Sequence, residues 1–323
     1  QGLQGPQGPE GTAGPDGPEG PVGPTGTKGP PGLDYSSMQI AMLRWYEAST
    51  TGYSFPAAAG PRALAFDGDH MWVANYSSNT ILKIRASDGS LLGSFPTGVG
   101  PQDIAFDGAH IWVANSGNDN IMKYKASDGS RMDIINVGSE PKALVFDGGS
   151  IWVANGGDNT ITKLKVSDGS LLGVFPVDAG PTALAFDGTN IWVANEEGNT
   201  LMKIRASDGS LQGTFQIESP RSIVFDGSHI WVASYENNSV ARIKASDGSL
   251  LDTYQVGVNP VSLVFDGANI WVANSGSNTV TKLNAPDGSL VGIFPVGNRP
   301  YDIAFDGANI WVANSEDSSV SKI

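Results

Sequence analysis

A repeat of about forty residues constrains this chain more than any other feature. The tetrapeptide WVAN, or WVAS in one copy, occurs seven times, at successive steps of 40, 40, 40, 39, 40 and 40 residues. Its tryptophans are Trp72, Trp112, Trp152, Trp192, Trp231, Trp271 and Trp311. Each copy holds four short β-type runs separated by Gly, Asp, Asn and Pro. Because a four-stranded unit of about 40 residues is typical of a propeller blade, the sequence predicts an all-β fold, a seven-bladed β-propeller.

The order of strands within a blade follows from alternation. In IWVAN the Ile and Val point to one face and the Trp and Ala to the other, so both faces are apolar, as in a sheet packed between two neighbours. We therefore expect the tryptophans to fill the core between blades. The run before each FDG, such as ALAF at 63–66, carries small residues and is expected to be the innermost strand.

Strand counting predicts how the ring closes. Only six outer strands of the LLGSF type lie between the seven copies, so the last blade lacks one. The segment GYSFPAAAGP at 52–61 matches the outer-strand pattern and precedes the first full copy. We expect it to complete the seventh blade against residues 310–323, which removes a free sheet edge.

Residues 1–34 follow a different rule. Glycine occupies every third position from Gly2 to Gly32 without a break, and Pro follows it in most triplets. Three polyproline-like strands can wind together only if every third residue lacks a side chain. The pattern predicts a collagen-like triple-helix stalk and hence a homotrimer. A flexible Gly/Pro linker is the alternative, but a linker has no reason to keep this register.

The segment 35–51 between the stalk and the propeller domain (52–323) is predicted to be a neck, most of it helical. Ser36 or Ser37 can cap a helix over 38–48, whose apolar residues recur at helical spacing. These residues are Met38, Ala41, Met42, Trp45 and Tyr46. Such a stripe would pack either in the trimer or on the chain's own propeller. An extra β-strand is the alternative, since MLRWYEAS parallels TILKIRAS.

The composition excludes several classes of function. The net charge is −14, and thirteen of the acidic residues are the Asp of FDG or DGS turns, where Asp-Gly supplies hairpin geometry. An acidic surface disfavours nucleic acid as a partner. No cysteine is present, which excludes disulfides, thiolate metal sites and thiol nucleophiles. No apolar run reaches the roughly 18 residues of a membrane span, so membrane insertion is not expected.

With its GPxxIAFDGxxIWVANxxxNTVxKI pattern, the repeat resembles the YVTN and NHL-type seven-bladed propellers of bacteria, including those related to virginiamycin B lyase. Residues 1–34 resemble bacterial and phage collagen-like stalks, and MQIAMLRWYEA resembles the lead-in of bacterial surface propellers. The lyase resemblance implies histidines and a glutamate around a magnesium ion. Here His70, His110 and His229 share one repeat position that is Ser or Asn in the other copies, which indicates a turn role. We therefore assign no catalytic residue, metal or cofactor, and find no P-loop, GxSxG or HExxH motif.

Candidate ligand-binding residues lie where the copies differ, because shared positions carry the fold. The two residues after the Pro that opens each inner strand vary most, and we expect them to ring one mouth of the central channel. The candidates are Arg62, Gln102, Asp103, Lys142, Thr182, Arg221, Tyr301 and Asp302. The loops after WVAN are expected on the same face and contribute Tyr76, Glu196, Glu197, Tyr235 and Glu236. Such side chains can bind a glycan or a peptide; neutral variation of exposed loops is the alternative.

Three functional hypotheses follow. The first is a non-enzymatic, extracellular or cell-surface homotrimer that acts in adhesion or receptor binding at a cell or virion surface, with a glycan or protein as ligand. The second is a structural subunit of an extracellular filament or appendage, in which the propellers self-assemble into fibres. The third is a lyase or hydrolase at the propeller mouth.

Overall fold

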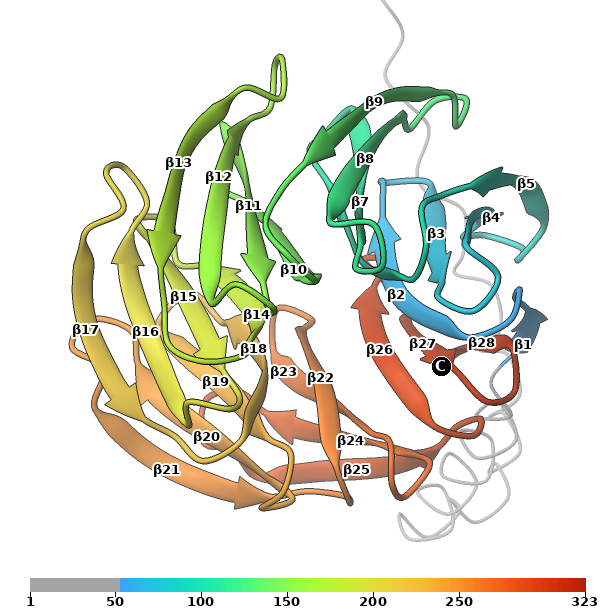
Figure 1. Cartoon of the computed structure of the whole chain (residues 1–323). Helices are drawn as coiled ribbons and strands as arrows, with labels where there is room; N and C mark the ends of the chain where they lie inside the picture. The colour runs from blue at the N-terminus through green and yellow to red at the C-terminus, as the bar shows by residue number, and fades with distance from the viewer. Residues whose placement is uncertain (1–52) are drawn as a thin grey trace, which may run out of the picture. The chain divides into compact units, whose positions relative to one another are not determined.

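The computed structural model describes residues 53–323, and these form 28 strands in seven four-stranded antiparallel sheets arranged as a propeller (Figure 1). The predicted all-β, seven-bladed fold is confirmed for these residues. The predictions of a stalk over 1–34, a neck over 35–51 and a trimer fall on residues outside this range. Within 53–323 no helix meets the length and hydrophobicity needed for a membrane span.

Each blade runs from an inner strand beside the channel to an outer strand at the rim. The inner strands are β2 (Pro61–Phe66), β6 (Pro101–Phe106), β10 (Pro141–Phe146), β14 (Pro181–Phe186), β18 (Pro220–Phe225), β22 (Pro260–Phe265) and β26 (Pro300–Phe305). The second strands, which carry the WVAN or WVAS repeat, are β3 (His70–Asn75), β7 (His110–Asn115), β11 (Ser150–Asn155), β15 (Asn190–Asn195), β19 (His229–Ser234), β23 (Asn269–Asn274) and β27 (Ile310–Asn314).

The outer half of each blade completes the sheet. The third strands are β4 (Thr80–Arg85), β8 (Asn120–Lys125), β12 (Thr160–Lys165), β16 (Thr200–Arg205), β20 (Ser239–Lys244), β24 (Thr279–Asn284) and β28 (Ser319–Lys322). The outer strands are β5 (Leu91–Pro96), β9 (Arg131–Asn136), β13 (Leu171–Pro176), β17 (Leu211–Gln216), β21 (Leu250–Gln255), β25 (Leu290–Pro295) and β1 (Tyr53–Pro56).

The ring closes as the strand count predicts. The strand β1 pairs antiparallel with β28, with Tyr53 opposite Lys322 and Phe55 opposite Val320, so the seventh sheet runs β1-β28-β27-β26. The Phe55 ring stacks on Trp311 with centroids 5.5 Å apart. Figure 1 shows the blue start of the propeller beside its red end.

Tryptophans form the core between blades, and each is tied to an aspartate of its own blade. Six of the seven are fully buried, and Trp271 is 7% exposed. Each indole Nε1 donates a hydrogen bond of 2.7–2.8 Å to Oδ2 of the Asp in the preceding FDG turn. The other oxygen of that Asp accepts turn amides; Asp187 Oδ1 lies 2.6 Å from the Asn190 nitrogen. The FDG aspartates therefore cap the turn and satisfy a buried indole at once.

Cations on the third strands join neighbouring blades. The Lys83 ammonium lies over the Trp72 ring, 5.3 Å from its centroid, and donates to the Ala126 carbonyl of the next blade at 2.6 Å. The same arrangement crosses the closure, where Lys322 lies over Trp311 and reaches the Ala86 carbonyl at 2.6 Å. These contacts combine cation–π attraction with a hydrogen bond to a backbone carbonyl of the next blade.

We expect loss of an indole–carboxylate hydrogen bond to lower the free energy of unfolding. Asp187→Ala leaves a buried indole N–H without an acceptor, and such a loss costs about 1–3 kcal/mol. Asp168→Ala removes an exposed DGS aspartate whose bonds to Ser170 water can replace, so it serves as the matched control. Urea unfolding monitored by tryptophan fluorescence measures both; equal losses for the two variants would contradict the special role of the FDG aspartates.

Candidate functional site

A β-bulge at the start of every inner strand creates the site. In each blade the pairing with the second strand skips one residue after the opening proline; Pro141 lies opposite Asn155, but Ala143 lies opposite Ala154. The same shift occurs in all seven blades. A bulge leaves the extra residue unpaired and redirects its side chain. The bulged residues are Arg62, Gln102, Lys142, Thr182, Arg221, Val261 and Tyr301.

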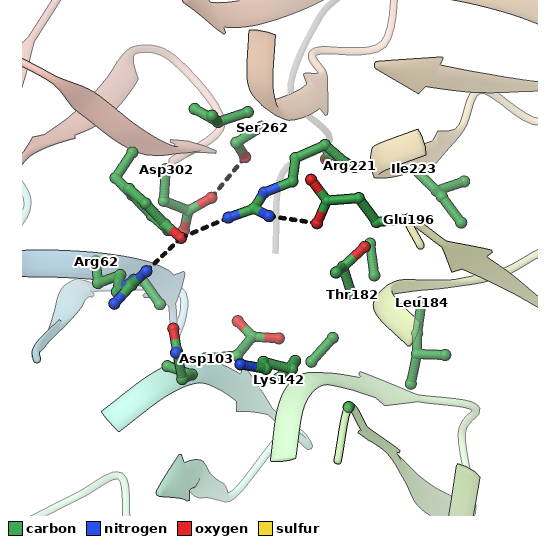
Figure 2. Close-up of a pocket in the computed structure, with 18 of the residues that line it drawn as sticks. Arg62, Asp103, Lys142, Thr182, Leu184, Glu196, Arg221, Ile223, Ser262 and Asp302 are labelled. Atoms are coloured by element: carbon green, nitrogen blue, oxygen red, sulfur yellow. Dashed lines mark hydrogen bonds and ion pairs between the residues drawn. The ribbon is translucent and has the colours of Figure 1, made fainter. Parts of the chain in front are cut away.

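These seven side chains line one cavity of about 460 Å³ (Figure 2). Asp103 and Asp302, the next residues in two of these strands, line it too, so the structure places all eight candidate residues at one cavity. Their role in binding stays a prediction. Of the WVAN-loop residues, Glu196 and Glu197 line the cavity, whereas Glu236 is exposed and does not.

Tyr301 bridges two arginines from distant blades. Its hydroxyl oxygen accepts hydrogen bonds from Arg62 Nη2 at 2.6 Å and from Arg221 Nη2 at 2.9 Å. Burial opposes ionisation of the phenol, but the two guanidinium charges outweigh it and hold the pKa of Tyr301 below its usual value. Arg221 also pairs with Glu196 (Figure 2). The bridge therefore brings two guanidinium groups together on one wall of the cavity.

Two tyrosines of the WVAN loops support these arginines from outside. The Arg62 guanidinium lies between the rings of Tyr76 and Tyr301, 4.4 and 4.3 Å from their centroids. The Arg221 guanidinium lies 5.7 Å from the Tyr235 centroid. The predicted loop tyrosines thus act on the site by fixing the arginines.

Asp103 and Asp302 also join neighbouring blades, a role that was not predicted. Asp103 Oδ2 accepts the Leu144 amide at 2.6 Å, and Asp302 Oδ2 accepts the Leu64 amide at 2.7 Å. Asp302 Oδ1 further accepts the Ser262 hydroxyl at 2.6 Å. Burial is the main cause that raises the pKa of Asp103 to about 7, and the charge of Asp302 adds to it. Burial likewise raises the pKa of Asp302.

Glu140 is a lining residue that sequence reasoning missed. It lies just before the proline of β10, in the left-handed region with φ of 51°, and its carboxylate pairs with Lys142 at 2.9 Å. Three of the other six copies have Gly at this position, and the remaining three have Ser, Asn and Arg. A charged residue just before the proline, where three copies have Gly, could have identified Glu140 from the sequence.

The three histidines lie at the FDG end of the blades, away from the cavity. His70 Nδ1 is 3.1 Å from Asp67 Oδ1, and His110 and His229 contact their own FDG aspartates in the same way. None of them is among the residues that line the cavity. Within residues 53–323, no group of three or more His, Cys, Asp or Glu side chains is placed to hold a metal ion.

No family model and no curated protein matches this sequence. Solved structures do match its fold. The hydrazine synthase of Kuenenia stuttgartiensis superposes with a TM-score of 0.74 at 20% identity, covering 82% of this chain and 95% of that one. Virginiamycin B lyase from Staphylococcus aureus gives 0.74 at 19% identity, covering 84% and 97%. A streptogramin B lyase gives 0.73 at 18% identity, covering 84% and 96%. The chain therefore shares the seven-bladed propeller of the virginiamycin B lyase-like structures, and at these identities the likeness shows the fold alone.

The raised pKa of Asp103 predicts a pH-dependent stability difference. Its folded-state pKa of about 7 exceeds the ordinary value of 3.8, so its stabilising contribution is fully present below about pH 4 and is lost as the pH rises through 7. Asp103→Asn stays neutral throughout. Thermal unfolding from pH 4 to 8 should show the variant gaining stability relative to the parent as pH rises; parallel curves would contradict the raised pKa.

Proposed function

We propose that the propeller is a binding module that holds a glycan in the cavity at the channel mouth. One observation carries this proposal: the seven bulged positions, where the otherwise similar copies differ, all line a single cavity. Residues with only a scaffold role would be expected to repeat from blade to blade, as the FDG aspartates and the tryptophans do. A volume of about 460 Å³ is within the range of small-ligand sites.

The chemistry of the walls favours a polyhydroxylated ligand. Charged and amide side chains such as Lys142, Gln102 and Glu197 offer donors and acceptors around the opening. Deeper inner-strand residues supply an apolar lining, among them Leu64, Leu184 and Ile223. Because the side chains project from a closed ring of paired strands, little ordering cost is expected on binding.

The Gly-X-Y run extends this proposal to the whole chain. A triple helix over 1–34 would join three propellers in one extracellular molecule, and three weak sites acting together can raise avidity by roughly 10² to 10⁴. This is the arrangement expected of an adhesion or receptor-binding protein at a cell or virion surface.

A second candidate function is a structural subunit of an extracellular filament. It is favoured by exposed leucines that recur at the first position of five outer strands, a set that we call the leucine rim. These are Leu91, Leu171, Leu211, Leu250 and Leu290, each 56–62% exposed. Exposed apolar surface of this kind is typical of sites of protein association.

Blocking the cavity tests the binding function without assuming the ligand's charge. Thr182→Trp adds an indole to a bulged position on the cavity wall and should abolish glycan-array binding by the full chain. Thr189→Trp is the matched control, because Thr189 is exposed in the FDG turn of the same blade. Unchanged binding by Thr182→Trp, with the fold intact by circular dichroism, would overturn the cavity as the site.

Sedimentation equilibrium of the full chain tests the assembly. A single species of three times the chain mass is expected for the stalked, receptor-binding molecule. Open-ended larger species would favour the filament instead. A monomer at micromolar concentration would contradict both the stalk and the avidity derived from it.

A further inference from the structure

The positive wall of the cavity is incompletely neutralised. Arg62 and Arg221 donate to the same Tyr301 hydroxyl oxygen, so two guanidinium groups converge on one oxygen atom. Arg221 has a carboxylate partner in Glu196. Of the three cations that line the cavity, Arg62 alone forms no ion pair with any described residue, since Lys142 pairs with Glu140.

Arg62 also has a donor nitrogen that no described residue uses. Its guanidinium lies over the Tyr76 and Tyr301 rings and donates to Tyr301 through Nη2. Its Nε is buried without a partner, so Nη1 is the nitrogen left open to a ligand. A guanidinium fixed in this way is suited to a planar carboxylate, which it can bind through two parallel hydrogen bonds. Arg62 and Tyr301 also line a second cavity of about 190 Å³, so the guanidinium lies where two cavities adjoin.

The other walls limit how much negative charge the ligand can carry. Five acidic residues line the same cavity, and together they would repel a dianion or a polyanion; they are Asp103, Glu140, Glu196, Glu197 and Asp302. Their oxygens can instead accept hydrogen bonds from hydroxyl groups. Between the two arginine-bearing strands lie Gln102, Lys142 and Thr182, whose polar groups can form hydrogen bonds with sugar hydroxyl groups.

We infer that Arg62, Arg221 and Tyr301 form a carboxylate-binding subsite, and that the ligand of the cavity is a saccharide with one carboxylate per binding unit. This inference rests on the proposed glycan-binding function and names its ligand class. The sugar carboxylate would pair with Arg62 beside the Tyr301 hydroxyl, and the sugar hydroxyls would face the acidic walls.

Isothermal titration of the full chain with matched saccharides tests the subsite. The probes are oligosaccharides ending in glucuronate, galacturonate or N-acetylneuraminate, each compared with its methyl ester, which keeps the ring and removes the charge. At least one acid is expected to bind, with its ester ten or more times weaker. Arg62→Gln should abolish that difference, whereas Arg131→Gln, at an exposed outer-strand arginine, should leave it unchanged.

The outcomes separate this inference from the proposal beneath it. If neutral glycans bind and acids show no advantage over their esters, the carboxylate subsite is wrong and the glycan-binding function stands. If Arg62→Gln keeps a tenfold preference for the acid, the subsite lies elsewhere and the inference also fails. If neither the probes nor any glycan on an array binds, the proposed function itself is overturned.

Discussion

The hydrogen bond between each tryptophan indole and the aspartate of its FDG turn is the contact on which the propeller depends. It lets a large aromatic residue fill the wedge between blades without leaving a buried donor unpaired. The same carboxylate holds the turn that leads from the inner strand to the second strand. A cation over the indole then reaches the next blade. Core packing, turn geometry and the contact between blades thus depend on one repeated group of three residues: the tryptophan, the FDG aspartate and the cation of the third strand.

This group occupies the FDG end of the blades, and the opposite end is organised by the bulge. An inner strand with regular pairing would alternate its side chains between neighbouring sheets, but the extra residue after each proline directs one side chain to the channel. The residue after the bulged one can contact the neighbouring blade. Asp302, which follows the bulged Tyr301, accepts a hydrogen bond from the Leu64 amide of the next blade. The bulge therefore separates residues free for recognition from those required for closure.

Much of the fold could be predicted from the sequence. The repeat of about forty residues specifies the blades and the closing strand, and the alternation of side chains between the two faces of a strand indicates the strand order. The variable pair after each proline located the cavity. The bridge of Arg62, Tyr301 and Arg221 could not be predicted, since it joins residues 239 and 80 positions apart that only the closed ring brings together. The FDG aspartates were assigned to turns alone because a turn motif does not reveal the indole that its carboxylate accepts.

We propose that the bulged end of the channel recognises a ligand and that the rest of the propeller holds that end in place. Solving the structure of the full chain with the tightest-binding array glycan tests this most directly. Sugar density is expected inside the cavity, within hydrogen-bond distance of Arg62, Tyr301 or Lys142. Density at the FDG turns or on the leucine rim, with the cavity holding only water, would contradict it.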